Sequence, residues 1–154
     1  MAIFNASKCA EYINKHKNPL IVVGDICDNV KLNGKMLTEY AVNVALKLDC
    51  HVAATGNTIL TIKKHESIKV KKMWLAELIV ALKGKWADPF ISERPDLLIF
   101  IGYRPEVIDG MVAGLKRIHS VHLGPGKSRA TNQGVEAVKF SEWESNLSEL
   151  IKEI

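Results

Sequence analysis

The stretch that decides the fold is Leu97-Leu98-Ile99-Phe100-Ile101-Gly102, five apolar residues in a row that end at a glycine. A run that is apolar at every position is typical of a strand buried on both faces, as in the centre of a parallel sheet. Three further short runs, over residues 20–24, 51–56 and 118–124, also end at a glycine. Segments with helical periodicity lie between them. The pattern predicts a single-domain α/β fold, with a parallel sheet of about five or six strands whose ends meet at one edge.

The periodic segments predict helices that flank this sheet. They cover residues 7–16, 36–48, 74–82, 105–115 and 141–154. Ser7 is expected to cap the first helix, and Ser141 with Glu144 has the spacing of a capping box for the last one. Gly110 and Gly114 are expected to permit close packing of the fourth helix on the sheet. A polar loop is predicted over residues 25–34 and a fifth strand over 135–140, whereas residues 57–72 give no clear signal.

Composition narrows the class of protein further. A length of 154 residues and a hydrophobic content of 47% fit one globular domain over residues 1–154. The net charge of +4, with sparse aromatic residues, is typical of a solvated surface rather than of a dedicated nucleic-acid binder. The three cysteines have no paired spacing, which favours a reducing compartment. Without a signal-like start or a long apolar run, a cytoplasmic protein with no membrane span is the expectation.

The edge where the strands end is the candidate binding site, because turn glycines there let backbone amides approach a phosphate. The candidate residues of this strand-end rim are Gly24, Asp25, Thr55, Gly56, Asn57, Gly102, Gly124, Lys127, Ser128 and Arg129. In the loop 124–129, Lys127 and Arg129 could neutralise a pyrophosphate. Walker A spacing is missing, since Val121 stands where its first glycine would be, and no GxGxxG occurs. This loop is either a phosphate contact or a plain surface turn.

Other reactive side chains give weaker signals. His119 and His122 are three residues apart in a predicted strand, so their side chains should point to opposite faces and cannot chelate one metal. Cys27 is expected to be a small loop residue rather than a reactive thiol. The sequence shows neither a nucleophile signature nor a distinctive pair of carboxylates. We therefore predict no catalytic residue and no metal site.

Three stretches and one loop together carry a resemblance to a known family. The stretches are Lys17-Asn18-Pro19-Leu20-Ile21-Val22-Val23-Gly24, Val52-Ala53-Ala54-Thr55-Gly56-Asn57 and Asp96-Leu97-Leu98-Ile99-Phe100-Ile101-Gly102-Tyr103, and the loop is the late polar one that contains Asn132. They resemble the epsilon subunit of the archaeal acetyl-CoA decarbonylase/synthase complex, the CO dehydrogenase assembly of methanogens. The resemblance covers nearly the whole chain. It implies a Rossmann-like fold of the deoxyhypusine-synthase-like NAD/FAD-binding group, which is similar to the central domain of thiamine-diphosphate enzymes.

The resemblance also implies a function. Members of this family are accessory subunits that bind the large nickel–iron–sulfur CO dehydrogenase subunit in an α2ε2 unit within a larger complex. They are thought to stabilise that unit or to help electrons pass to FAD, so no tightly bound cofactor is expected and FAD is the one implied. The chain departs from the family at Tyr103-Arg104-Pro105-Glu106, where an aromatic-rich stretch is usual, and at Asn132-Gln133-Gly134, where Asn-Ala is usual.

Two other functions stay open at this point. The chain could be a free-standing FAD- or NAD-binding protein that uses the strand-end rim. As a separate expectation about partners, the isolated chain could form a homo-oligomer. Nucleic-acid binding through the basic cluster over residues 63–72 ranks last and would require affinity that falls steeply with salt. Trp86, Phe90 and Trp143 are candidates either for interface anchors or for plain core residues.

Overall fold

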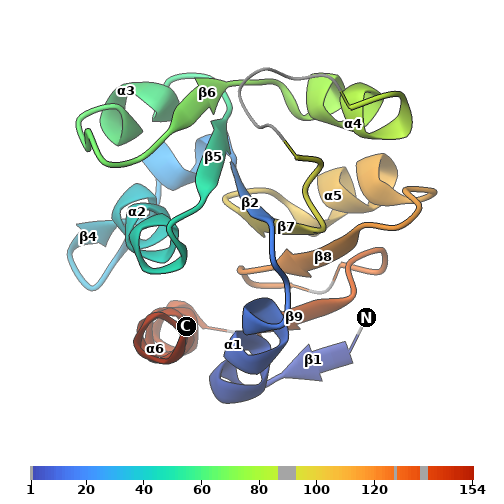
Figure 1. Ribbon diagram of the computed structural model, residues 1–154. Coiled ribbons are helices and arrows are strands. Elements are labelled where there is room, and N and C mark those ends of the chain that lie inside the picture. Colours follow the sequence, from blue (N-terminus) through green and yellow to red (C-terminus); the bar gives the residue numbers. More distant parts are fainter. Residues whose placement is uncertain (1, 87–92, 127, 136–138) are drawn as a thin grey trace.

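The computed structural model describes residues 2–86, 93–126, 128–135 and 139–154. These residues form a seven-stranded sheet in which all neighbouring strands are parallel (Figure 1). In order across the sheet the strands are β1 (Ala2–Phe4), β9 (Gln133–Val135), β8 (His119–His122), β7 (Leu97–Ile101), β2 (Pro19–Val23), β5 (His51–Ala54) and β6 (Val70–Lys72). Apart from β1, this is the 3-2-1-4-5-6 strand order of doubly wound α/β folds. The predicted α/β fold with a parallel sheet is confirmed, although the sheet has seven strands rather than about five or six.

Helices cover both faces of the sheet (Figure 1). One face carries α1 (Ala6–Asn14), α2 (Leu37–Leu48), α3 (Thr58–Ile62) and α6 (Phe140–Glu153), and the other carries α4 (Leu75–Lys83) and α5 (Pro105–Val112). Alternate residues of a strand point to opposite faces. Accordingly, Ile99 and Ile101 of β7 belong to the core under α1, α2 and α6, whereas Leu98 and Phe100 belong to the core under α4 and α5.

Regular structure occurs in the segment predicted as a polar loop, residues 25–34, and in the segment without a clear signal, residues 57–72. Residues 25–34 form the short 3-10 helix η1 (Asp25–Asp28) and most of a hairpin between β3 (Lys31–Leu32) and β4 (Lys35–Met36). The hairpin turns at Asn33 and Gly34, whose φ angles of 51° and 79° are those a tight two-residue turn requires. Residues 57–72 contain α3 and β6. Because η1 and the hairpin intervene, α2 begins only at Leu37, although β2 ends at Val23.

Several predicted boundaries are wrong. The fifth strand, expected over 135–140, is β9 at Gln133–Val135, and α6 has begun by Phe140. Asn5 rather than Ser7 caps α1, since its Oδ1 accepts the Lys8 N–H at 2.9 Å. The first turn of α6 is closed by Glu142, which accepts the Lys139 N–H at 3.2 Å, so Ser141 and Glu144 do not form the expected capping box.

The glycines of α5 do not pack on the sheet as expected. A Cβ atom on either Gly110 or Gly114 would meet nothing within 4 Å. The sheet is instead contacted by Ile108 and Val112, which are buried. Gly114 has a φ of +90° and lies two residues beyond Val112, the last residue of α5, so it helps to end the helix earlier than residue 115.

None of the helices in the described part of the chain combines the length and the apolar character that a membrane span requires.

Candidate functional site

The crevice between the carboxyl ends of β2 and β7 is where a doubly wound fold binds ligands. These strands are neighbours, but the chain leaves β2 toward α2 on one face and leaves β7 toward α5 on the other. Gly24 and Gly102 are the first residues beyond these two strands, and Thr55 and Leu123 are the first beyond β5 and β8. The fold therefore brings the predicted turns to one edge.

Within this crevice the backbones of Gly24 and Gly102 are in direct contact. The Gly24 N–H donates to the carbonyl of Ile101 at 2.9 Å. A Cβ atom on Gly24 would lie 2.2 Å from the carbonyl oxygen of Gly102, and one on Gly102 would lie 2.4 Å from the Cys27 sulfur. Both positions therefore require glycine because the chain packs against itself, and the contact leaves no space for a phosphate between them.

Tyr103 covers the ends of β2 and β5. Its hydroxyl lies 2.6 Å from Thr55 Oγ1 and 3.4 Å from the carbonyl oxygen of Val23. The Thr55 hydroxyl also donates to the Met73 carbonyl at 3.3 Å, and the Thr55 carbonyl accepts from Thr58 at 2.6 Å. Burial raises the pKa of Tyr103 to about 12, so the phenol stays protonated. The polar groups of Thr55 are thus engaged within the protein, while Gly56 and Asn57 form the turn into α3.

Cys27 closes the crevice from the side of η1. Its side chain is fully buried and donates to the Ile101 carbonyl at 3.5 Å. Burial, and secondarily the charge of Asp28, raise the pKa of this thiol well above its ordinary value. A thiolate is the reactive form of cysteine. Cys27 thus lies in η1 rather than in a loop, and its environment favours the thiol over the reactive thiolate.

The polar loop after β8 binds a carboxylate of the protein itself, the side chain of Asp109. Asp109 of α5 accepts from Ser128 Oγ at 2.5 Å, from the Arg129 N–H at 2.8 Å and from the Ala130 N–H at 3.0 Å. Ser128 is buried, with 1% of its surface exposed. The hydroxyl and amides that the sequence offers to a phosphate are therefore held by a carboxylate. Lys127 lies outside the described residues.

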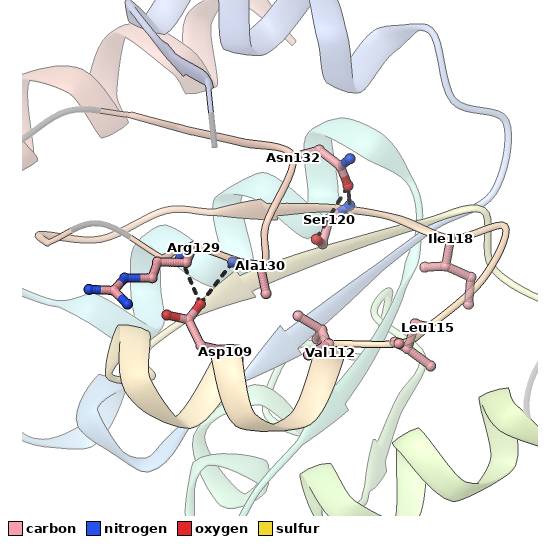
Figure 2. A pocket seen from close by; sticks show the side chains of 10 residues that line it. Asp109, Val112, Leu115, Ile118, Ser120, Arg129, Ala130 and Asn132 are labelled. Atoms are coloured by element: carbon pink, nitrogen blue, oxygen red, sulfur yellow. Dashed lines mark hydrogen bonds between the residues drawn. The ribbon is translucent and has the colours of Figure 1, made fainter.

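A pocket of about 410 Å³ lies beside this loop, on the face of the sheet that carries α5 (Figure 2). Its lining residues are Asp109, Val112, Ala113, Gly114, Leu115, Ile118, Ser120, Arg129, Ala130 and Asn132. Asn132 Oδ1 accepts from the Ser120 N–H at 2.8 Å and lies 3.5 Å from Ser120 Oγ. Sequence reasoning overlooked this pocket, because its walls come together only when α5 packs on β8. Of the residues singled out from sequence, Arg129 and Asn132 line it.

A smaller pocket of about 170 Å³ lies at the strand ends and is almost wholly apolar. Tyr103, Pro105, Phe140 and Trp143 are among its lining residues. Sites for small molecules commonly measure about 300–1,000 Å³. This pocket therefore matches one apolar side chain better than a dinucleotide.

The two histidines of β8 lie on opposite faces, as predicted. His119 is on the α1 side, with its Nδ1 atom 2.7 Å from the hydroxyl of Tyr12. His122 is buried on the α5 side, and its Nε2 atom lies 3.3 Å from the Tyr103 carbonyl oxygen. Burial lowers the pKa of His122. Among the described residues, no group of three or more His, Cys, Asp or Glu side chains could hold a metal ion.

Comparison with known proteins bears on the fold alone. No family model matches the chain, and no curated protein matches it. A solved structure from Mycobacterium smegmatis, of a protein assigned to the thiamin diphosphate-dependent enzymes, is similar at a TM-score of 0.51 and 17% sequence identity. The match covers 94% of this chain and 27% of that one, so the chain spans about a quarter of the structure it resembles. The class that fold and comparison define is a Rossmann-like α/β protein.

Removing the carboxylate of Asp109 should destabilise the loop after β8. We expect Asp109→Ala to lower the free energy of unfolding by about 2 kcal/mol, because three donors lose their acceptor. Urea denaturation at pH 7 measures the loss. Glu106→Ala is the matched control, since Glu106 is an exposed carboxylate in the first turn of the same helix. An equal effect of both substitutions would contradict the role assigned to Asp109.

The same experiment has a predicted pH dependence. Burial opposes ionisation of Asp109, but the hydrogen bonds from Ser128, Arg129 and Ala130 prevail and hold its pKa below the ordinary value. A carboxyl group of this kind stabilises the fold above its unfolded pKa, and the contribution is lost as pH falls through the folded pKa. The difference between wild type and Asp109→Ala should therefore shrink below about pH 4. A difference that stays constant down to pH 3 would refute this expectation.

Proposed function

We propose that the chain is an accessory, non-catalytic subunit of an acetyl-CoA decarbonylase/synthase complex in the cytoplasm. In this proposal it binds the large nickel–iron–sulfur CO dehydrogenase subunit in an α2ε2 unit, and it stabilises that subunit or assists electron transfer to FAD. The observation that supports the proposal is the position of the three stretches that resemble the epsilon subunit. They contain β2, β5 and β7, which are neighbours in the sheet.

The ends of these three stretches contact one another. Gly24 of the first stretch touches Gly102 of the third, and Thr55 of the second lies within hydrogen-bond distance of Tyr103. Short apolar strands resemble one another in many α/β proteins, so isolated matches carry little weight. Matches that include the residues joining the strands are more specific, because these residues must change together if the arrangement changes.

The alternative, FAD or NAD binding at the strand-end rim, has less support. Gly24 and Gly102 fill the crevice between β2 and β7, and Ser128 is held by Asp109. In doubly wound folds the pyrophosphate sits at the start of the helix that follows the first strand. Here η1 and the hairpin occupy that connection, and the Leu37 N–H at the start of α2 donates to the Val30 carbonyl at 2.8 Å. The rim residues therefore do not fit a dinucleotide in this arrangement.

Exposed aromatic residues at the carboxyl edge are available to contact a partner. Trp74, just beyond β6, is 68% exposed and Phe140, at the start of α6, is 58% exposed. Aromatic residues are enriched among the side chains that dominate binding energy at interfaces. Of the anchors considered from sequence, Trp143 is buried, Trp86 is partly buried against the core, and Phe90 lies outside the described residues. Trp74 and Phe140 are thus the better candidates.

Affinity capture of the tagged chain from its own anaerobic cell extract tests the proposal. We expect a large CO dehydrogenase subunit in equal amount, and no CO oxidation by the isolated chain. Trp74→Asp and Phe140→Asp should each reduce the capture, whereas Lys152→Asp, an exposed change at the end of α6, should not. A chain that elutes alone, or that oxidises CO alone, would overturn the proposal. Binding of FAD or NAD to such a chain would establish the alternative.

A further inference from the structure

We propose that the pocket beside α5 binds a small organic anion with a flat apolar body. This pocket is separate from the strand-end crevice, and the inference does not depend on the proposed partner. Its volume of about 410 Å³ lies within the range of small-molecule sites, about 300–1,000 Å³.

The walls of the pocket provide an apolar surface. Val112 and Leu115 lie at the end of α5 and just beyond it, and Ile118 and Ala130 come from the segments on either side of β8 (Figure 2). Leu115, Ile118 and Ala130 are only partly buried, so part of their surface is available to a ligand. A planar ring placed on them would remove apolar area from water, which favours binding.

Asn132 supplies a hydrogen-bond donor of fixed orientation. The backbone N–H of Ser120 requires an oxygen acceptor, and it donates to Asn132 Oδ1 at 2.8 Å. The Asn132 N–H in turn donates to the Ser120 carbonyl at 2.9 Å, which fixes the backbone beside the pocket. The atom left over is Nδ2, which has no acceptor within the described part of the chain. Because Nδ2 only donates, Asn132 selects for a ligand that carries acceptor oxygens.

The charges around the pocket favour an anion. Arg129 lines the pocket on the same side as Asp109, and its guanidinium extends past Asp109 at the rim, away from the apolar walls (Figure 2). No described residue accepts a hydrogen bond from this guanidinium, although its charge interacts with that of Asp109. Lys116 and Arg117 are exposed and lie in the chain between the lining residues Leu115 and Ile118. Asp109 is the only acidic lining residue, and one of its oxygens already accepts from the loop. A cleft bordered by an excess of positive charge concentrates anions.

These features require a ligand with an anionic group and an apolar ring, but the anionic group could be a carboxylate or a phosphate. A carboxylate or a phosphate monoester can accept from Asn132 Nδ2 while its ring lies on the apolar wall, and the positive charge of Arg129 at the rim favours its approach. Adenosine 5′-monophosphate and benzoate are suitable probes for the two kinds of anion. Adenosine and benzyl alcohol are their uncharged counterparts.

NMR titration of the full-length ¹⁵N-labelled chain tests the proposal. We expect at least one anionic probe to shift the backbone amide signals of Ser120, Ala130 and Asn132, with near saturation at about 10 mM for a Kd of about 1 mM. Adenosine and benzyl alcohol should bind at least tenfold more weakly. A response to adenosine 5′-monophosphate alone would identify a phosphate ester, and one to benzoate alone would identify a carboxylate.

Two variants separate recognition from folding. Asn132→Asp keeps an oxygen for the Ser120 N–H but replaces the free donor by a negative charge, and Arg129→Glu reverses an exposed charge while keeping its backbone N–H for Asp109. Each should weaken binding of the anionic probe at least tenfold, whereas Lys152→Glu should leave it unchanged. The absence of shifts with both anions, equal binding of the uncharged counterparts, or unchanged affinity in both variants would overturn the proposal.

Discussion

Gly102→Ala is expected to lower the free energy of unfolding by about 3 kcal/mol, through two separate effects. Gly102 has a φ of +85°, a region that residues with a Cβ atom seldom adopt. The added methyl group would also lie 2.4 Å from the Cys27 sulfur and 2.8 Å from the Gly24 carbonyl oxygen. Neither neighbour can move away easily, because the Cys27 N–H donates to that same Gly24 carbonyl at 3.1 Å.

Equilibrium denaturation in urea measures this loss, with Gly110→Ala as the matched control. Gly110 lies inside α5, where a methyl group would meet nothing within 4 Å. Alanine is favoured over glycine inside a helix by about 1 kcal/mol, so the control should become more stable. Opposite signs for the two substitutions are therefore expected. If Gly102→Ala changed stability by less than about 1 kcal/mol, the crevice between β2 and β7 would be open in solution, and the strand-end rim would regain support as a ligand site.

The central strands were predictable because burial on both faces leaves a direct mark on the sequence. The run 97–101 is apolar at every position, and it becomes β7 in the middle of the sheet. The edge strand β6 was missed for the converse reason. It contains Val70 and two lysines, and a three-residue strand at an edge buries too little surface to require an apolar run.

The helix boundaries were harder to predict, because more than one residue near each end can serve as a cap. Asn5 and Ser7 are both favourable capping residues, and the one used depends on where the preceding chain leads. The fold places β1 immediately before α1, so the helix begins at Ala6 with Asn5 as its cap. Similarly, Glu144 is drawn to the Tyr40 hydroxyl at 3.1 Å, a contact across 104 residues that local spacing cannot reveal.

The strand-end rim shows what local sequence can and cannot indicate about a site. Glycine is required wherever another group approaches the backbone closely, whether that group is a phosphate or the chain itself. The sequence therefore located the turns at Gly24 and Gly102 but could not identify what contacts them. The loop after β8 could be interpreted from sequence either as a phosphate contact or as a plain surface turn. Its actual partner, Asp109, lies about twenty residues earlier, on a different element.

Trp143→Ala should be among the most destabilising substitutions in the chain, with a loss of about 3–5 kcal/mol in the free energy of unfolding. Trp143 is 4% exposed and belongs to the core shared by α1, α2 and α6. Its indole N–H donates to the Leu123 carbonyl at 3.2 Å, which ties α6 to the end of β8. Truncation would remove this hydrogen bond and join the space of the indole ring to the neighbouring apolar pocket, which Trp143 also lines.

The control is Trp74→Ala, which removes an indole that is 68% exposed and should change stability by no more than about 0.5 kcal/mol. Trp143→Phe completes the series. It keeps most of the buried ring and loses mainly the hydrogen bond to Leu123, so a loss of about 1 kcal/mol is expected. The loss of stability should therefore be largest for Trp143→Ala, smaller for Trp143→Phe and smallest for Trp74→Ala. This ranking follows from a core role for Trp143 and a surface role for Trp74. If Trp143→Ala were no more harmful than Trp74→Ala, Trp143 would have to be exposed in solution, and it would return as a candidate anchor for the partner subunit.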